Sequence, residues 1–386
     1  MSAALTPLSH LGTMPVHEFL ARYWQRQAVC IRQAIAGFTS PISRPRLFAL
    51  ASDPEVESRL VTVFSGRWKV RAGPIFPRAM PSLHRARWTL LVQGVDLHDA
   101  AVWALAARFR FVPVARFDDV MVSYASDAGG VGPHVDQYDV FLLQAQGRRR
   151  WRVATEFDPR PVQEVPLRLL ANFRHQREWV LEPGDLLYLP PGVAHEGVAL
   201  GACITISIGF RLPDRQEILE AWIDRQSRAP ARVDRFADCT RTPTQSPARL
   251  PASLLQSVAR ELDRARATSV QVRRTLLEHL TEPKPAVTFT PRPGGAALPR
   301  FAGAARRRGV ILDLRTRMLY QGADIAINGE VLASIPPVVR RLLRALANRQ
   351  YLAPPALAGV GGRNARALFS LLYNWYRFGW LHVGAK

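Results

Sequence analysis

A series of short β-rich segments between Asp119 and Phe210 constrains the fold of this chain more than any other feature. Glycine and proline separate the segments, which read VMVSYA, YDVFLLQ, RRRWRV, REWVLEPGDLLYLPPG and ACITISIGF. Many short strands with this punctuation are typical of an antiparallel barrel or sandwich. Because helical patterns lie on both sides of this region, we expect an α+β protein built around a β-barrel.

Three side chains in this region form a candidate metal site. His134 and Asp136 lie two residues apart in GPHVDQYD, and the period of a strand points both to the same face. His195 comes later, after the predicted strand Leu186–Leu189 and a Pro-Pro-Gly turn. An isolated His-x-Asp pair is weak evidence. Two histidines and one carboxylate on one face of a metal, however, leave the open positions that non-heme Fe(II) oxygenases use.

Arg149, fifteen residues after His134, is a candidate for binding a cosubstrate. We expect VFLLQAQGRRRWRV to form a hairpin with Arg149 on its second strand. A dicarboxylate that chelates iron through its keto-acid end needs a partner for its far carboxylate, and arginine offers a fixed bidentate one. Arg148 and Arg150 should face the other way, toward solvent. The alternative is that all three arginines are surface charges in a tight turn.

The rest of the chain divides into three predicted parts. Residues 1–211 hold the barrel, with its core at about 95–211, and begin with a helical and then extended lead-in. Residues 212–300 are predicted to be helical, notably over Ser253–Leu280, with loops at Thr240–Pro251 and a proline-rich linker at 281–300. Residues 301–386 contain an Asn328-Gly329 hairpin signal, two helices and a strand-like end, which favours a winged-helix-like domain.

Charge and cysteine content restrict the partners and the compartment. Lys+Arg number 52 against 31 Asp+Glu, and the net charge of +21 favours polyanions such as RNA, DNA or a ribonucleoprotein. An arginine-rich composition spread over solvated faces explains the same number equally well. The 3 cysteines are far apart, which fits neither a disulfide framework nor a zinc site. No apolar run suits a membrane span and no signal peptide is apparent, so we expect a cytoplasmic protein without a membrane partner.

The motifs as a whole resemble a known family. The strings GGVGPHVDQYDVFLLQAQGRRRWRV, LEPGDLLYLPPGVAHEG and ISIGFR are similar to the bacterial ribosomal oxygenases of the JmjC class, within the cupin superfamily. The likeness extends to FLARYWQRQAVCIRQA, to EVESRLV before WKVRAGP, and to the ending. It implies a JmjC double-stranded β-helix barrel with N-terminal helices, a helical dimerisation region that forms a homodimer, and a C-terminal winged helix.

The resemblance also implies an activity. Members of this family use Fe(II), 2-oxoglutarate and O2 to hydroxylate the β-carbon of an arginine in a large-subunit ribosomal protein of the L-sixteen family, and they release succinate and CO2. For this chain it implies that Ser123 helps Arg149 to bind 2-oxoglutarate. It places the substrate arginine against Asp119, Met121, Tyr138 and Ser207.

These substrate roles make physical sense, but each has a simpler alternative. A carboxylate at Asp119 can accept hydrogen bonds from a guanidinium, and Tyr138 can stack on its plane. Asp119 could instead cap a turn. Tyr138 and Met121 could simply pack in the barrel, and Ser207 is a small strand residue with the same ambiguity.

Two rival functions remain open. The same iron chemistry could act on a histidine of a ribosomal protein or on methyl-lysine, although Asp119 favours arginine. A non-catalytic ribosome-binding or nucleic-acid-binding protein could use the high positive charge alone. A pure binding protein has no need of a complete metal triad, so we rank this reading below the enzyme.

Overall fold

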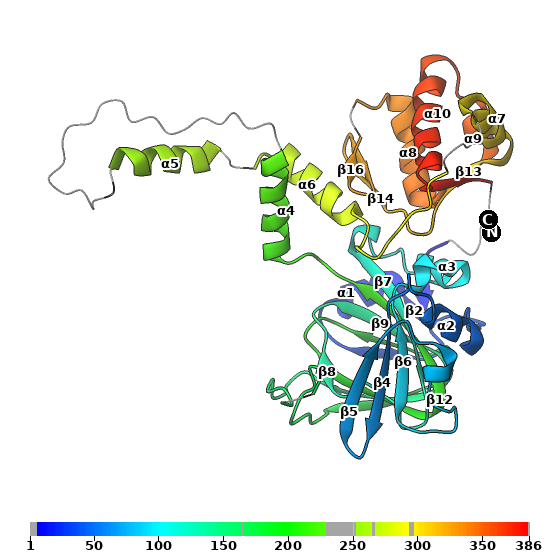
Figure 1. Cartoon of the computed structure of the whole chain (residues 1–386), viewed down its shortest axis with the longest axis vertical. Coiled ribbons are helices and arrows are strands. Elements are labelled where there is room, and N and C mark those ends of the chain that lie inside the picture. The colour runs from blue at the N-terminus through cyan, green and yellow to red at the C-terminus, as the bar shows by residue number, and fades with distance from the viewer. Residues whose placement is uncertain are drawn as a thin grey trace.

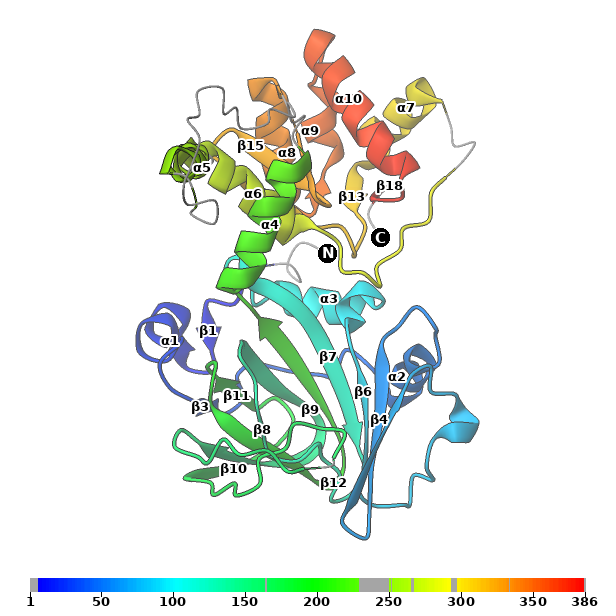
Figure 2. The ribbon, with the colours of Figure 1, turned by 60° about the vertical axis from the view of Figure 1, so that its left-hand side comes forward.

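The computed structural model of the chain describes residues 6–163, 165–228, 250, 252–264, 267–292, 297–332 and 334–384. A β-barrel forms one end of the molecule and a mixed helix and strand unit forms the other, with helices α4 and α6 alongside their junction (Figure 1, Figure 2). Cys30 and Cys203 are free thiols, and Cys239 lies outside the described residues. None of the described helices has the length and apolar character that crossing a membrane requires.

The barrel is built from one antiparallel sheet of ten strands. In spatial order its main path is β3 (Val29–Ile31), β11 (Leu186–Leu189), β9 (Asp139–Ala154), β12 (Ala194–Phe210), β7 (Phe117–Ala125), β6 (Trp88–Val92), β4 (Ser58–Phe64) and β5 (Arg67–Ala72). Two further strands pair beside this path, β10 (Arg177–Leu181) with β9 and β8 (His134–Val135) with β12. The prediction of an antiparallel barrel is confirmed, and the sheet also includes strands that precede residue 95.

One local prediction is wrong. VFLLQAQGRRRWRV does not turn back as a hairpin, because β9 continues through Gly147 as a single long strand paired with β12. Gly147 has φ +65°, and a Cβ there would lie 2.2 Å from the carbonyl oxygen of Ala202 on the neighbouring strand. Gly147 therefore allows β9 and β12 to approach each other closely, and it does not mark a chain reversal.

The two faces of the central strands differ in character, as period-two alternation requires. On one face of β7 and β12 the residues are almost fully buried in the main core: Val120, Val122, Tyr124, Ile204, Ile206 and Ile208. The other face carries Asp119, Met121, Ser123, Thr205 and Ser207. The register sets Ser123 opposite Thr205 and Met121 opposite Ser207. One side of the sheet thus holds the fold together, which leaves the other free for a polar site.

The N-terminal elements close the main core on its apolar side. They are β1 (His10–Leu11), β2 (Met14–Pro15), α1 (Val16–Arg22), α2 (Arg44–Ala51) and α3 (Ala100–Ala107), with single 3-10 turns at Pro77–Ala79, Val95–Leu97 and Val114–Arg116. Phe19 of α1 is fully buried, with its ring centroid 5.0 Å from that of Tyr188 and 5.4 Å from that of Phe141. Such aromatic contacts bury large apolar areas and anchor the lead-in on the barrel.

Three helices follow the barrel: α4 (Arg215–Arg228), α5 (Ala252–Arg264) and α6 (Ser269–Thr281). The region predicted to be helical, Ser253–Leu280, contains most of α5 and most of α6. Thr268 is the N-cap residue of α6. Its side chain accepts a hydrogen bond from the backbone N–H of Gln271, and the two residues form a capping box. Of the predicted loop Thr240–Pro251, every residue except Leu250 lies outside the described ranges, as do residues 293–296 of the predicted linker.

The C-terminal unit has its own apolar core, which includes Phe301, Leu343, Leu372 and Trp375. Its elements are α7 (Leu298–Arg308), β13 (Val310–Leu312), β14 (Met318–Gln321), β15 (Asp324–Ile327), β16 (Glu330–Val331), α8 (Pro337–Arg349), β17 (Tyr351–Leu352), α9 (Pro354–Ala358), α10 (Gly362–Arg377) and β18 (Leu381–Val383). The predicted hairpin is present, with β15 and β16 joined through Asn328 and Gly329 at φ +47° and +85°. The winged-helix assignment itself stays a prediction.

Candidate metal and cosubstrate site

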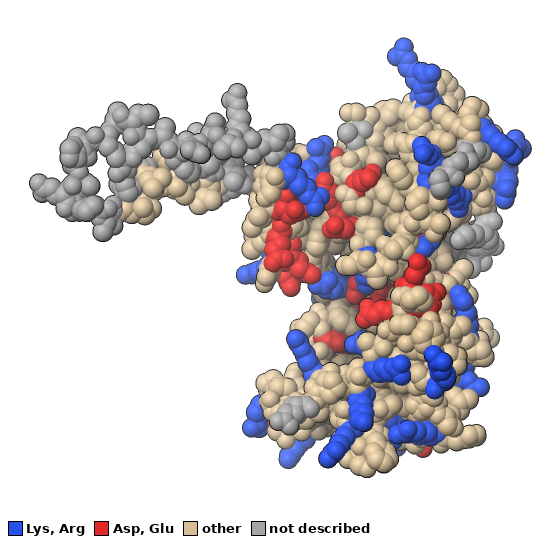
Figure 3. Space-filling model, in the orientation of Figure 1, with Lys and Arg blue, Asp and Glu red and all other residues tan. Residues whose placement is uncertain are grey.

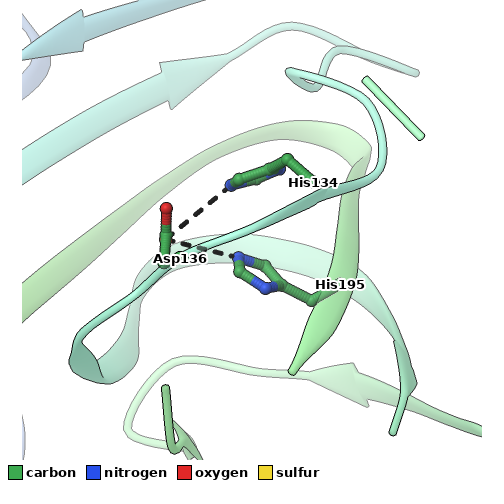
Figure 4. A group of neighbouring side chains, drawn as sticks. All are labelled: His134, Asp136 and His195. Carbon is green, nitrogen blue, oxygen red and sulfur yellow. Dashed lines mark ion pairs between the residues drawn. The ribbon is translucent and has the colours of Figure 1, made fainter. Parts of the chain in front are cut away.

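The strand register brings the three predicted metal ligands together. His134 of β8 lies directly opposite His195 of β12, and Asp136 follows β8 at once. Nε2 of His134 lies 3.8 Å from Oδ2 of Asp136, and Nε2 of His195 lies 3.7 Å from the same oxygen (Figure 4). One ligand atom from each residue fits within 4.8 Å of the others, so a single ion can be held by all three.

Backbone carbonyls fix the orientation of both imidazoles. Nδ1 of His134 lies 2.9 Å from the carbonyl oxygen of Gly132, and Nδ1 of His195 lies 3.0 Å from that of Val193. A carbonyl oxygen can only accept, so Nδ1 carries the proton in each ring and Nε2 keeps its lone pair. This is the tautomer that a metal ligand requires, held in place by outer partners.

Burial and exposure divide the site into a closed and an open side. The His195 side chain is only 3% exposed, whereas those of His134 and Asp136 are each 26% exposed. Burial, reinforced by the neighbouring His134, lowers the pKa of His195 to about 4. His195 is therefore a neutral donor at neutral pH, and the open side gives reactants access to the ion. Two neutral imidazoles and one carboxylate on one side are a donor set that suits Fe(II) with positions left for other ligands.

Arg149 is a buried cation that forms no ion pair with a carboxylate of the described residues. It is 3% exposed, and its guanidinium donates from Nη1 to Oγ of Ser123 at 3.1 Å and from Nη2 to the carbonyl oxygen of Gly197 at 3.1 Å. Its Nε has no hydrogen-bond partner among the described residues, and burial lowers the pKa of the group. An unpaired buried charge is costly, so the site is built to receive an anion. Arg148 is exposed and Arg150 is half-buried beside Glu178, as the alternation predicts.

Several supporting residues were missed in the sequence. Thr205 accepts a long hydrogen bond of 3.4 Å from Nη1 of Arg149 and donates to Oε1 of Gln144 at 3.0 Å, while the guanidinium lies 4.9 Å from the centroid of the Trp151 ring. Gly197 leaves the space that the guanidinium fills, since a Cβ there would lie 2.6 Å from Nε of Arg149. Nothing in the local sequence could have revealed these roles, because each depends on cross-strand pairing.

The residues assigned to the substrate lie on the polar face of the barrel. Asp119 is 7% exposed, and its Oδ2 accepts no hydrogen bond from any described residue. Burial raises its pKa, while Lys284, whose Nζ lies 3.9 Å from that oxygen, opposes the rise. Tyr138 is half-buried, and burial followed by the charges of Asp136 and Asp119 raises the pKa of its phenol, which stays neutral. Met121 is half-buried, and its strand partner is Ser207, which is 8% exposed.

An antiparallel barrel with this fold and a His-Asp-His triad on its polar face defines the class as a JmjC-type oxygenase. The family model "JmjC domain" matches residues 104–218, and an overlapping model, "AraC-like ligand binding domain", matches residues 172–272. The ribosomal protein uL16 3-hydroxylase of Escherichia coli (strain K12) is 33% identical over 326 residues, which cover 82% of this chain and 85% of the relative.

Other relatives and solved structures agree. A probable ribosomal oxygenase of Haemophilus influenzae is 35% identical over 52% of this chain and 51% of its own length. The structure of YcfD, a ribosomal oxygenase from Escherichia coli, in complex with cobalt and 2-oxoglutarate is 30% identical, with a TM-score of 0.84 over 97% of this chain and 99% of that one. The chain belongs to the JmjC-domain ribosomal oxygenase family.

Proposed function

We propose that this protein uses Fe(II), 2-oxoglutarate and O2 to hydroxylate an arginine of the large-subunit ribosomal protein uL16. The observation that carries the proposal is the presence of an open His134-Asp136-His195 triad together with Arg149, a buried cation that no carboxylate of the described residues pairs with. Two similar proteins support it: one is named a uL16 3-hydroxylase, and the other is a ribosomal oxygenase whose structure was solved in complex with cobalt and 2-oxoglutarate.

The chain contributes binding and orientation to this reaction. When bound to the triad, Fe(II) supplies oxygen activation coupled to the conversion of 2-oxoglutarate into succinate and CO2. Nε2 of His134, Nε2 of His195 and a carboxylate oxygen of Asp136 would hold the ion. Arg149 would bind the far carboxylate of 2-oxoglutarate, with Ser123 holding the guanidinium in place. Fixing that carboxylate sets how the keto-acid end faces the metal, which is the positional control that catalysis needs.

The substrate arginine would lie against the polar face near Asp119. Oδ2 of Asp119 accepts no hydrogen bond from any described residue, so it is suited to accept one from a guanidinium, and a neutral Tyr138 offers an aromatic face. With Met121 and Ser207 beside it, this arrangement would present the β-carbon to the metal. Arginine hydroxylation is a narrower activity than family membership implies. A more distant relative is named a bifunctional lysine-specific demethylase and histidyl-hydroxylase.

The proposal is tested with purified protein, Fe(II), isotope-labelled 2-oxoglutarate and peptides of uL16. Mass spectrometry should find one added oxygen on the β-carbon of an arginine, with labelled succinate formed in step. Oxygen on a histidine, or loss of a methyl group from lysine, would replace the arginine assignment. Absence of 2-oxoglutarate turnover with every peptide would overturn the enzyme proposal.

Asp119→Asn isolates the substrate contact. Losing a hydrogen bond to a charged group costs about 2 kcal/mol, so KM for the arginine peptide should rise roughly 30-fold, while the metal and 2-oxoglutarate bind as before. An unchanged KM would show that Asp119 does not contact the substrate.

We also propose that α4 and α5 mediate a homodimer. Leu219 and Ile223 of α4 are 60% and 61% exposed, and Leu255 and Leu262 of α5 are 54% and 70% exposed. Apolar side chains gathered on exposed helices are typical of interaction surfaces. Leu219→Glu together with Ile223→Glu should convert a dimer into a monomer in light scattering. A wild-type chain that is monomeric at micromolar concentration would contradict the proposal.

A further inference from the structure

The charge of this protein is not evenly distributed. Between Glu57 and Asp96 the sequence contains no Asp or Glu, while Arg and Lys recur throughout. This stretch forms β4, β5 and β6, the last three strands at one edge of the sheet. In Figure 3 blue side chains spread over the lower part of the barrel, whereas most of the red ones lie higher, toward the junction with the C-terminal unit.

One face of the β4–β5 hairpin gathers these cations around an exposed aromatic ring. Arg67, Lys69 and Arg71 alternate along β5, so they share a face, and all three are exposed. The antiparallel register pairs Phe64 with Arg67, which places the ring on that same face. Phe64 is 68% exposed, and the guanidinium of Arg85 lies 5.9 Å from its centroid. We call these five residues the basic hairpin face.

The cations of this face have no acidic partner. Elsewhere in the molecule arginines pair with carboxylates, as Arg152 does with Glu178 at 2.9 Å. Within the described part of the chain, none of the four cations of the basic hairpin face forms an ion pair. Lysine and arginine on an edge strand can simply prevent sheet-to-sheet aggregation. That role does not account for an exposed phenylalanine ring that lies opposite Arg67 and close to the guanidinium of Arg85.

The other face of the same strand reaches the metal site. Trp68 alternates with Arg67 and Lys69 and points the opposite way, and a Cβ on Gly132 would lie 3.1 Å from its ring. The carbonyl oxygen of Gly132 orients the imidazole of His134. The basic hairpin face therefore lies on the outer side of a strand whose inner side packs against the metal-binding loop.

We infer that the basic hairpin face binds RNA on the outer side of the strand that packs against the metal-binding loop. Unpaired cations attract phosphates, and an exposed aromatic ring among them provides a stacking surface for a base. A basic ribosomal protein would be repelled by this face, so the complementary partner is a polyanion rather than the protein substrate alone. RNA already associated with the substrate would fit both surfaces at once. This inference does not depend on which residue is hydroxylated.

The test measures binding of a fluorescently labelled single-stranded RNA to the full chain by polarisation, over a range of salt concentrations. The variant R67Q/K69Q/R71Q removes three charges from the face. The matched control R307Q/R341Q/R349Q removes three exposed charges from α7 and α8. Removing three phosphate contacts should lower the slope of log K against log salt by about 2, and the control should leave the slope unchanged.

A second variant examines the aromatic ring. Phe64→Leu keeps an apolar side chain but removes the stacking surface, so the affinity for RNA should fall about tenfold at an unchanged salt slope. Hydroxylation of a free peptide should be the same in wild type and in both hairpin variants, because none of the changed residues contacts the triad or Arg149.

Three results would overturn the inference. The wild type could fail to bind RNA at low salt, or the hairpin and control triple variants could lower the affinity and the slope equally. Alternatively, polyglutamate of matched charge could displace the labelled RNA as well as unlabelled RNA does, while Phe64→Leu leaves the affinity for RNA unchanged. That last outcome would point to an acidic protein as the partner.

Discussion

Replacing Arg149 with methionine should separate the stability of the barrel from its affinity for 2-oxoglutarate. The guanidinium is 3% exposed and has no carboxylate partner within the described chain. Removing such a charge relieves a desolvation cost of several kcal/mol. It also removes hydrogen bonds to Ser123, Thr205 and Gly197, each of which contributes about 1.5–3 kcal/mol when the donor is charged. The two effects offset each other, so the free energy of unfolding of the free protein should change by less than about 2 kcal/mol.

The effect on the bound state should be much larger. Loss of a bidentate charge pair costs about 3 kcal/mol, which weakens the Kd of 2-oxoglutarate roughly 100-fold. At a concentration of 100 times the wild-type Kd, the cosubstrate stabilises the wild type by about 2.7 kcal/mol but the variant by only about 0.4 kcal/mol.

The assay is thermal unfolding with Mn(II) in place of iron, with and without 2-oxoglutarate. Arg148→Met is the matched control, because Arg148 is the exposed neighbour on the same strand. The Arg148→Met variant should keep the full increase in Tm that 2-oxoglutarate causes in the wild type. An Arg149→Met variant that keeps this increase, or an Arg148→Met variant that loses it, would refute the role of Arg149.

Two further predictions concern the glycine beside Arg149 and a buried carboxyl group. Gly197→Ala should weaken 2-oxoglutarate binding at least about tenfold without loss of metal, because its Cβ would lie 2.6 Å from Nε of Arg149. Gly359→Ala is the control, because nothing lies within 4 Å of an added Cβ there. It should leave the affinity for 2-oxoglutarate unchanged in calorimetric titration. Equal losses of affinity in the two variants would refute the steric argument. Asp96 is 2% exposed, and burial followed by the charge of Asp119 raises its pKa from 3.8 to about 7. The folded state therefore holds more protons between these values, and stability falls as pH rises from about 4 to about 7. Asp96→Asn should remove that loss. In urea denaturation the variant should be more stable than wild type by up to about 4 kcal/mol at pH 8, and little different at about pH 3, below both pKa values. A difference that is the same at both pH values would contradict the assignment.

The clustering of His134, Asp136 and His195 could be predicted from sequence because its signals are local. A strand period places His134 and Asp136 on one face without any knowledge of the fold, and the Pro-Pro-Gly turn marks the approach to His195. The residues around Arg149 could not be predicted in this way. Gly197 and Thr205 act through pairing between strands that are far apart in the sequence, and one strand does not reveal its partner's register.

The error in secondary structure at Gly147 has a physical cause. Gly147 signals a turn in isolation, but its conformational freedom is used for the close approach of β9 and β12, which only the paired structure reveals. By contrast, the start of α6 has a local signal, because Thr268 and Gln271 have the spacing of a capping box.

Anaerobic titration of the purified protein with Fe(II) and 2-oxoglutarate tests the central claim most directly. Chelation of 2-oxoglutarate to ferrous ion produces a visible charge-transfer absorption. The wild type should develop this absorption with one equivalent of metal, and His134→Ala and His195→Ala should each abolish it. A wild type that takes up no ferrous ion, or an absorption that persists in both variants, would contradict the triad.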